Sequence, residues 1–211
     1  MFVKSIMIPK HLTISVQETD TLEAALEKLE ENKIDGMPIL KEDEYIGVVT
    51  RYNIYENYFK SNQPKEVFLK QTQVKEIVSH QNKFLLGKEL FEETLIELKD
   101  FPLLAVVEEN RKFLGVVTRA DVLEQFQSVF GKNRPGVRIT FTSVETEGRL
   151  ARLSEIAHNF RIKIISLVTF DETDKLVRRI VMKIEKKGYS EKFIKKLEES
   201  GFRVLDIHED Q

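Results

Sequence analysis

The chain has 211 residues, 41% hydrophobic and 32% charged, a composition typical of a globular protein. Its 33 Lys and Arg residues against 35 Asp and Glu residues leave a net charge of −2, which argues against bulk binding to nucleic acid or an anionic membrane. The absence of cysteine excludes disulfides, thiolate metal sites and a cysteine nucleophile. No run approaches the roughly 20 apolar residues of a membrane helix, and residues 1–9 lack a signal-peptide core, so we expect a cytoplasmic protein.

The first part of the chain predicts the order strand, helix, strand, strand, helix. Thr13–Val16 alternates as a short strand, Met37–Leu40 is an apolar strand, and Tyr45–Val49 returns after an acidic turn. Between the first two strands, apolar residues recur on one helical face at Leu22, Ala25, Leu26 and Leu29.

The second part repeats this order with less regularity. Its predicted strands are Phe84–Leu86, Leu103–Val107 and Phe113–Val117. The predicted helix presents Phe91, Leu95 and Leu98 on one face.

A pentapeptide, Gly-Val-Val-Thr-Arg, occurs at both Gly47–Arg51 and Gly115–Arg119. Five consecutive identities at a fixed offset indicate a duplicated unit. In each copy a buried strand is expected to end in a polar turn, where ligand-contacting groups often lie. Aligned without gaps on the pentapeptide, Met37–Ile39 falls on Ala105–Val107, whereas the helices upstream align best after a one-residue gap.

The third part begins after the glycine- and proline-containing break at Gly131–Gly136. Its pattern predicts βαββαβ, the ferredoxin-like arrangement. The strands are expected at Val137–Val144, Ile162–Phe170, Leu176–Ile184 and Phe202–Ile207, and the helical faces at Leu150–Phe160 and Tyr189–Leu197. We therefore expect an α/β (α+β) chain divided into residues 1–60, a linker at 61–71, residues 72–130, a linker at 131–136, and residues 137–211.

The two repeats resemble CBS domains. The resemblance rests on an apolar strand, a glycine, two apolar residues and then Thr-x-x-Asp, and it covers about residues 1–130. It implies an antiparallel pair, a Bateman module, with clefts that bind an adenosine-containing ligand such as AMP, ADP, ATP or S-adenosylmethionine.

Carried over to this sequence, the resemblance implies that Thr118 and Asp121 hold a ribose, since a hydroxyl and a carboxylate one helical turn apart can both reach a 2′,3′-diol. In the first repeat Thr50 matches, but Asn53 replaces the aspartate and can donate as well as accept. We therefore expect the Thr118–Asp121 cleft to be the stronger ribose site.

The variable position after the hydroxyl residue is Arg51 in one repeat and Arg119 in the other. A guanidinium there could bind a phosphate, or it could be a solvent-exposed arginine at a helix start. The resemblance also implies an adenine pocket lined by small and apolar residues; the alternative is that they are sheet core. The candidates are Thr13, Ile14, Met37, Pro38, Ala105 and Val106.

The third part resembles an ACT domain. In that family a loop of the form Asp-x-x-Gly-x-Leu binds a small amino acid, and the matching residues here are Glu147, Gly148 and Leu150, with Glu145 at the aspartate position. Gly148 could instead serve only a tight turn. The combination of two CBS-like repeats, a Phe-Gly-x-x-x-Pro-Gly linker and an ACT-like unit resembles the AcuB group associated with acetoin utilisation in bacteria.

Enzyme signatures are missing from the sequence. The four histidines, His11, His80, His158 and His208, have no zinc-ligand spacing, and no nucleophile elbow or phosphate-binding glycine loop is present. We expect a non-catalytic, homodimeric sensor that binds an adenosine-containing ligand and acts on an unidentified regulated protein. The alternatives are a structural subunit with a vestigial CBS cleft and an ACT-based amino-acid sensor.

Overall fold

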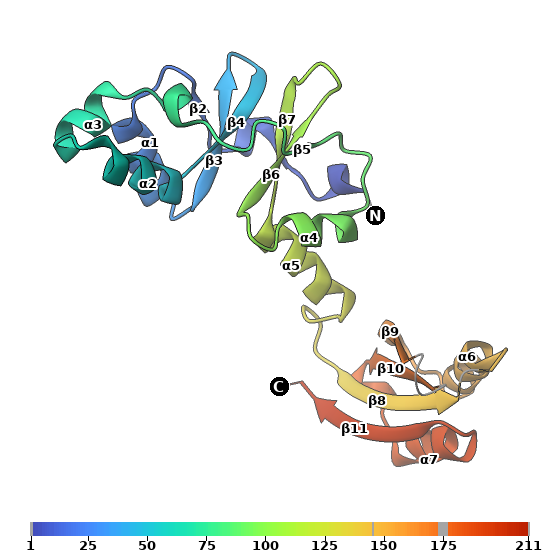
Figure 1. Cartoon of the computed structure of the whole chain (residues 1–211). Coiled ribbons are helices and arrows are strands. Elements are labelled where there is room, and N and C mark those ends of the chain that lie inside the picture. The colour runs from blue at the N-terminus through green and yellow to red at the C-terminus, as the bar shows by residue number, and fades with distance from the viewer. Residues whose placement is uncertain (1, 145, 173–176, 211) are drawn as a thin grey trace. The chain divides into compact units, whose positions relative to one another are not determined.

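The computed structural model describes residues 2–144, 146–172 and 177–210, with the backbone alone at residues 171 and 172. It divides into two compact units, Met1–Leu123 and Glu124–Gln211, and the boundary falls within one helix (Figure 1). Among the described residues, no helix combines the length and the apolar character that crossing a membrane requires.

The first unit contains two copies of a small α/β repeat. The elements of the first copy are η1 (Val3–Ser5), β1 (Ile8–Pro9), η2 (Lys10–Leu12), β2 (Val16–Gln17), α1 (Leu22–Glu31), β3 (Gly36–Lys41), β4 (Glu44–Thr50), α2 (Arg51–Ser61) and α3 (Lys65–Gln71). Those of the second are η3 (Val74–Ile77), β5 (Phe84–Leu85), η4 (Phe91–Glu93), α4 (Thr94–Glu97), β6 (Leu103–Val107), β7 (Phe113–Thr118) and α5 (Arg119–Val129).

Each copy builds its own small sheet. In the first, β2 runs parallel to β3 and β3 pairs antiparallel with β4; in the second, β5, β6 and β7 repeat this arrangement. The order strand, helix, strand, strand, helix predicted for each repeat is therefore confirmed. Strand β1, from the start of the first repeat, joins the sheet of the second by pairing with β7.

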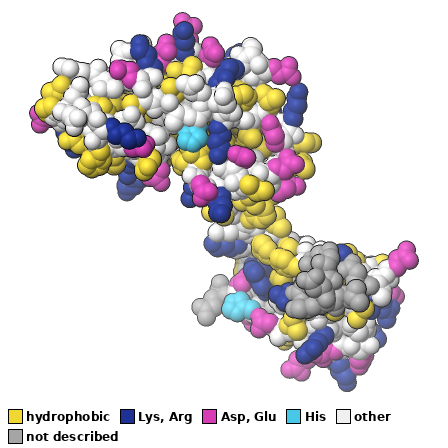
Figure 2. All heavy atoms as spheres, viewed as in Figure 1, with side chains coloured by type: hydrophobic (Ala, Val, Ile, Leu, Met, Phe, Trp, Pro, Cys, Tyr) yellow, Lys and Arg dark blue, Asp and Glu magenta, His cyan; other side chains and the backbone are white. Residues whose placement is uncertain are grey.

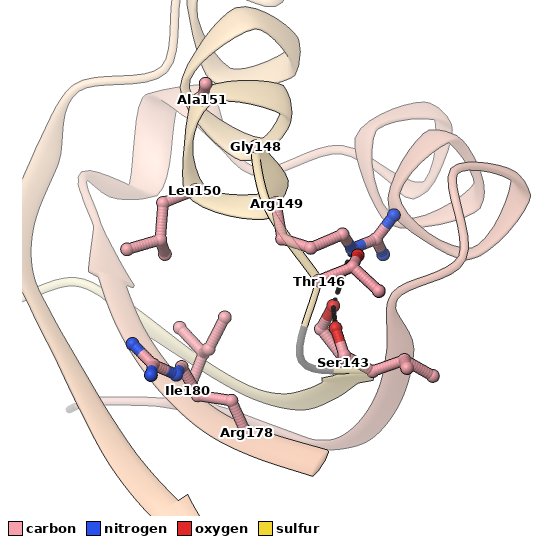
Figure 3. A pocket seen from close by; sticks show the side chains of 9 residues that line it. Ser143, Thr146, Gly148, Arg149, Leu150, Ala151, Arg178 and Ile180 are labelled. Carbon is pink, nitrogen blue, oxygen red and sulfur yellow. Dashed lines mark hydrogen bonds between the residues drawn. The ribbon is translucent and has the colours of Figure 1, made fainter. Parts of the chain in front are cut away.

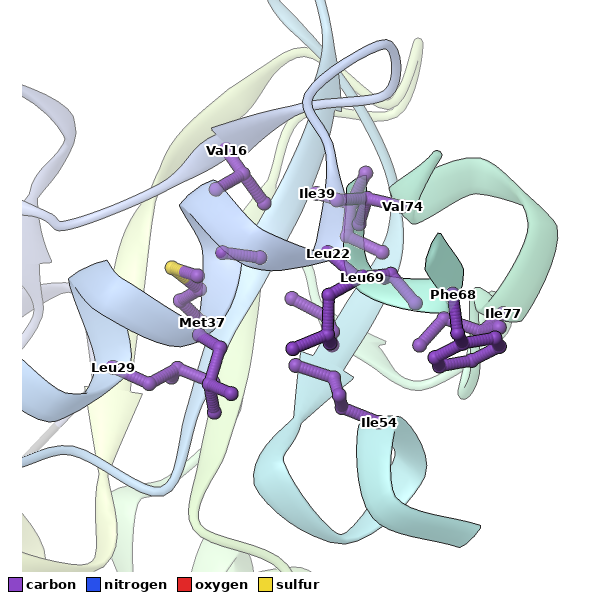
Figure 4. Packing of buried hydrophobic residues seen from close by; sticks show 13 residues of the cluster. Val16, Leu22, Leu29, Met37, Ile39, Ile54, Phe68, Leu69, Val74 and Ile77 are labelled. Atoms are coloured by element: carbon purple, nitrogen blue, oxygen red, sulfur yellow. The ribbon is translucent and has the colours of Figure 1, made fainter. Parts of the chain in front are cut away.

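Helix α1 forms because its apolar residues share one face and its start is capped. The Thr21 hydroxyl accepts a hydrogen bond from the Ala24 amide at 3.3 Å. Leu22, Ala25 and Leu29 are fully buried. They pack with strand residues such as Met37 and Ile39 and with Phe68 and Leu69 of α3 in one cluster (Figure 4).

The expected strand at Thr13–Val16 is wrong at its start, because strand β2 covers only Val16–Gln17. Thr13 follows the short helix η2, and its hydroxyl lies 3.1 Å from the carbonyl oxygens of both Ile8 and Pro9. The alternating pattern extends further than the strand because this side-chain hydrogen bonding favours a turn.

The expected connection at 61–71 contains a helix that its composition does not predict, because Lys65–Gln71 forms α3. Phe68 and Leu69 are buried in the core of the first repeat. A helix of this length gains most of its stability from such packing, which the composition of the segment does not reveal.

The helix expected across Phe91, Leu95 and Leu98 is also shorter than predicted. The segment holds the 3₁₀ turn η4 followed by the four-residue helix α4. Of its three apolar residues only Leu98 is buried, so little packing stabilises a longer helix.

Strand register corrects the gap-free alignment of the two repeats by one residue. Gly36 pairs with Thr50 and Leu103 pairs with Thr118, so Met37 corresponds to Leu104 and Pro38 to Ala105. The hairpin between Leu103 and Thr118 is therefore one residue longer than the hairpin between Gly36 and Thr50, and this insertion accounts for the one-residue gap upstream.

The second unit has the predicted ferredoxin-like βαββαβ order. After the end of α5 it contains β8 (Val137–Val144), α6 (Arg149–Asn159), β9 (Ile164–Glu172), β10 (Val177–Ile184), the 3₁₀ turn η6 (Lys186–Gly188), α7 (Glu191–Glu199) and β11 (Arg203–Glu209). All strands are antiparallel, in the order β11-β8-β10-β9. Apolar residues of β8 and β10 alternate toward α6 and α7 and form a separate core with Phe193 and Leu197.

A buried cation fixes the start of this unit to its sheet. The Lys183 side chain on β10 is 1% exposed; its Nζ donates to the Gly131 carbonyl oxygen at 2.8 Å and forms an ion pair with Asp210. The Asp210 amide donates to the Gly136 carbonyl oxygen at 2.9 Å. Residues 131–136 therefore pack as part of the second unit.

Candidate functional site

The glycine of each pentapeptide lies where a segment of the other repeat crosses its strand. At Gly115, a Cβ atom would lie 2.1 Å from the Ile8 carbonyl oxygen; at Gly47, it would lie 2.3 Å from a Val78 methyl carbon and 2.7 Å from the Ser79 carbonyl oxygen. Real Cβ atoms do not approach other atoms so closely, so the exchange of segments requires glycine at both positions.

Thr118 and Asp121 form a reciprocal pair at the start of α5. One oxygen of the Asp121 carboxylate accepts from the Thr118 hydroxyl at 2.5 Å and from the Thr118 amide at 2.9 Å. In return the Asp121 amide donates to the Thr118 hydroxyl oxygen at 3.2 Å. This capping arrangement holds the hydroxyl and the carboxylate side by side at the end of β7.

The first repeat has a different pair at the equivalent place. The Thr50 hydroxyl donates to Asn53 Oδ1 at 2.7 Å, and the Ser79 hydroxyl lies 3.0 Å from the same oxygen. In the second repeat the crossing residue at this position is Ile8, which has no side-chain donor. The hydroxyls of Thr50 and Ser79 thus engage the Asn53 amide oxygen, leaving its NH₂ group as the donor for any ligand.

The two arginines contact the ends of the preceding helical segments. Arg51 donates from Nε and Nη2 to the Ile34 carbonyl oxygen at 3.1 and 2.9 Å, and from Nη2 to that of Leu29 at 3.1 Å. Arg119 is more exposed and donates from Nε to the Leu98 carbonyl oxygen at 2.9 Å. Positive charge at the C-terminal end of a helix is stabilising, so both have a structural role.

Two neighbouring cavities lie beside these groups. The first, of about 440 Å³, is lined by Asp35, Thr50, Arg51, Tyr52, Asn53, His80, Asp100, Phe101 and Pro102. The second, of about 370 Å³, is lined by Ile34, Asp35, Gly36, Pro102, Leu103, Thr118, Arg119, Ala120 and Leu123. We call them the Thr50 cavity and the Thr118 cavity. Each combines the polar turn of one repeat with the start of a strand in the other, and Asp35 and Pro102 line both.

The Thr50 cavity includes an aromatic pair, because the His80 ring lies 4.1 Å from that of Phe101, centroid to centroid. Burial, together with the nearby Lys83 charge, lowers the pKa of His80. The imidazole is therefore neutral at neutral pH and can stack or accept a hydrogen bond without adding positive charge.

The residues expected to contact ligand divide into two groups. Thr50, Arg51 and Asn53 line one cavity, Thr118 and Arg119 line the other, and Asp121 is hydrogen-bonded to Thr118. The adenine-pocket candidates Thr13, Ile14, Met37, Pro38, Ala105 and Val106 line neither cavity. Met37, Ala105 and Val106 are fully buried in the sheets, which agrees with the alternative that these residues belong to the sheet core.

Several cavity residues were missed by sequence reasoning: Asp35, His80, Asp100, Phe101 and Pro102. They lie in short connections ahead of a strand and belong to no motif. The correct register makes Asp35 equivalent to Pro102, so the same position of each repeat lines both cavities.

A third cavity, of about 280 Å³, lies in the second unit at the expected amino-acid loop. Leu150 of α6 and Arg178 of β10 lie on opposite sides of it (Figure 3). Gly148 lines it with a left-handed φ of +80°, and a Cβ there would meet open space, so the turn rather than crowding accounts for the glycine. Glu147 is exposed and outside the lining, and Glu145 lies outside the described residues.

Comparison with known proteins identifies the family and the fold of the first unit. The CBS domain family model matches residues 3–60 and 74–128, together more than half of the chain. A CBS domain-containing protein of unknown function from Bacillus anthracis str. Ames Ancestor is 24% identical, with a TM-score of 0.54 over 61% of this chain and 94% of that one. Listeria monocytogenes CbpB, solved in complex with c-di-AMP, is 24% identical, with a TM-score of 0.53 over 60% and 95%.

A third solved structure, a hypothetical conserved protein from Geobacillus kaustophilus, is 22% identical, with a TM-score of 0.55 over 61% of this chain and 97% of that one. At these identities the likeness shows a shared fold. The two matches to the family model coincide with the two α/β repeats of the first unit. The chain belongs to the CBS domain family and carries two CBS domains in tandem.

Proposed function

We propose that this chain is a non-catalytic regulatory protein that binds an adenosine-containing ligand between its two CBS domains. The observation that supports it most is the pairing of Thr118 with Asp121 beside a cavity to which both repeats contribute. The two cavities have volumes within the range of about 300–1,000 Å³ that is usual for small-molecule sites.

The ligand class is an adenine nucleotide or a related adenosyl compound. The Listeria protein of the same fold was solved with c-di-AMP, which adds that dinucleotide to AMP, ADP, ATP and S-adenosylmethionine as candidates. In the Thr118 cavity, a ribose diol would hydrogen-bond to Thr118 and Asp121, while the terminal nitrogens of Arg119 reach a phosphate.

A thermal-shift experiment with these five compounds tests the proposal. A ligand at 100 times its Kd stabilises the folded state by about 2.7 kcal/mol. The Thr118→Val, Asp121→Ala double variant should lose the shift caused by the ligand that stabilises the wild type. Since this variant also loses a helix cap worth about 1 kcal/mol, each protein is compared with its own ligand-free melting temperature.

The matched control is Thr50→Val, Asn53→Ala, which changes the equivalent pair in the other repeat. We expect it to retain most of the shift. If the Thr118→Val, Asp121→Ala variant keeps the full shift, the site lies elsewhere. A wild type that none of the five compounds stabilises would instead favour a constitutive subunit with a vestigial cleft, an alternative motivated by Asn53 and the engagement of its amide oxygen.

A second function, amino-acid sensing by the second unit, is favoured by the cavity beside Gly148 and Leu150. Its lining includes Arg178 of β10 and residues at the start of α6. The arginine and the N-terminal end of the helix would both favour the carboxylate of a bound amino acid. The ferredoxin-like order and this loop support an ACT-like assignment. Thermal shift with the twenty amino acids tests it, and Arg178→Gln should reduce any response.

The arrangement of tandem CBS domains before such a unit also supports membership in the AcuB group and a role in acetoin or related carbon metabolism. On this interpretation the ligand changes how a partner protein is engaged, and both kinds of domain imply a homodimer. Helix α2 offers a surface for self-association, because Tyr52, Tyr55 and Phe59 are exposed on it. Hydrophobic side chains are visible on the surface at this end of the first unit (Figure 2).

A further inference from the structure

Given the proposed function, on which this inference rests, we propose that Asp35 and Asp100 make the cleft selective against ligands with a chain of phosphates. The cleft then prefers a nucleoside monophosphate, or another adenosyl ligand of low negative charge, to ATP. The selectivity follows from the charges that line the two cavities.

The two carboxylates occupy central positions in the cleft. Asp35 lies between α1 and β3 and lines both cavities, whereas Asp100 lies between α4 and β6 and lines the Thr50 cavity. Both residues are exposed, and among the described residues neither carboxylate has an ion-pair partner. Both side chains are therefore available to a ligand.

The positive charge in the Thr50 cavity does not offset them. The Arg51 guanidinium donates three hydrogen bonds to backbone carbonyl oxygens, and these bonds compete with any bond from Nε or Nη2 to a phosphate. Lowering of its pKa leaves His80 neutral at neutral pH. Lys33 and Lys99, each close in sequence to one of the carboxylates, line neither cavity. The Thr50 cavity thus contains two carboxylates and one cationic side chain, Arg51, which is already hydrogen-bonded to the backbone.

The Thr118 cavity is less restrictive. Arg119 uses only Nε for the Leu98 carbonyl oxygen and keeps its terminal nitrogens for a phosphate. Asp35 nevertheless lies in the same lining, and Asp121 lies two residues beyond Arg119 in the first turn of α5. One phosphate can pair with Arg119, whereas further phosphates would extend toward carboxylates.

Carboxylates also have a favourable role in such a cleft. They accept hydrogen bonds from ribose hydroxyls and from the exocyclic amine of adenine. Repulsion of each added phosphate charge across several ångströms of partly solvated cavity corresponds to roughly a three- to tenfold loss of affinity. The preference for AMP over ATP is accordingly expected to be about tenfold or more.

Isothermal titration of the full chain with AMP, ADP and ATP tests the inference. The buffer contains EDTA and no magnesium, because Mg²⁺ would neutralise the phosphate chain, and ionic strength is held constant. We expect affinity to fall from AMP to ADP to ATP. Asp35→Asn and Asp100→Asn should each narrow the ratio of AMP to ATP affinity by about threefold or more, and the double variant further.

Glu27→Gln is the matched control, because Glu27 is an exposed carboxylate of the same unit that lines neither cavity. It should leave the ratio unchanged, which separates a local effect from the change in net charge. ATP binding as tightly as AMP to the wild type, or an unchanged ratio in Asp35→Asn, Asp100→Asn, would overturn the inference while the proposed function stands. Absence of heat with all three nucleotides, with adenosine, and with S-adenosylmethionine and c-di-AMP would overturn both.

Discussion

At the scale of single residues, the two pentapeptide glycines are explained by crowding. Replacing Gly115 with alanine would place a methyl group 2.1 Å from the Ile8 carbonyl oxygen and 2.9 Å from Met7 Cγ. Strand β1 would have to move away from β7, and overpacking of this kind costs about 1–3 kcal/mol. Urea unfolding should therefore show Gly115→Ala less stable than the wild type by about 2 kcal/mol or more.

Gly148→Ala provides the comparison, because Gly148 also lacks a Cβ but faces open space. Its left-handed backbone alone should cost about 1 kcal/mol. Equal losses at the two positions would contradict the explanation by crowding.

The buried Lys183 makes a second prediction at this scale. The hydrogen bond from Lys183 is the largest cause of the lowered pKa of the Asp210 carboxyl. A carboxyl whose pKa is lower in the folded state contributes stability above its ordinary pKa, and that contribution disappears as the pH falls through the folded value. Asp210→Asn should cost about 1–2 kcal/mol at neutral pH, and the difference from wild type should shrink as the pH falls below the ordinary pKa of the carboxyl.

Urea unfolding at pH 7 and at about pH 3 measures this difference. The Lys183→Met, Asp210→Asn double variant is the control, since it removes the buried charge together with its partner. It should be more stable than Asp210→Asn alone. A loss of stability in Asp210→Asn that is the same at both pH values would contradict a role for the charge.

At the scale of elements, helix α2 differs from the other helices of the first unit in its exposed aromatic residues. Tyr52 is 71% exposed and Phe59 82% exposed, and with Tyr55 they follow helical spacing. If this face joins two copies of the chain, Tyr55→Ser, Phe59→Ser should weaken the dimer at least about tenfold in sedimentation equilibrium.

Ile96→Ser tests the specificity of that effect. Ile96 of α4 is 81% exposed, similar to Phe59, but no other residue of that helix is an exposed large hydrophobic one. It should leave self-association unchanged. If the wild-type chain is monomeric at all accessible concentrations, the proposal that α2 joins two copies of the chain is wrong.

At the scale of the whole molecule, the boundary between the units falls inside α5, before the break that the sequence suggests. Within the second unit, the carbonyl oxygens of Gly131 and Gly136 accept hydrogen bonds from Lys183 and Asp210. A fragment of residues 124–211 should therefore be more stable than one of residues 137–211, by about 1–3 kcal/mol for the charged hydrogen bond. Urea unfolding of the two fragments measures the difference, and equal stabilities would show that residues 131–136 are only a linker.

Much of the fold was predictable because its signals are local. Alternation in Val137–Val144 and helical spacing from Leu22 to Leu29 identified those elements, and the repeated pentapeptide identified the duplication. The same signals placed Thr118 beside Asp121, because a hydroxyl and a carboxylate three residues apart cap a helix. They failed at Thr13–Val16, where the Thr13 hydroxyl bonds to nearby backbone oxygens, and they did not reveal the helix within 61–71, which packs on the core of the first repeat.

The sequence by itself determined the order of the elements, the two copies and the polar turn that ends each β-hairpin, since each depends on neighbours in the chain. The tertiary structure alone decided that the repeats exchange segments, that Asp35 and Pro102 join two cavities, and that Arg51 binds backbone carbonyl oxygens. These features depend on residues far apart in sequence that meet only when strands pair in one register, and composition and periodicity carry no record of that meeting.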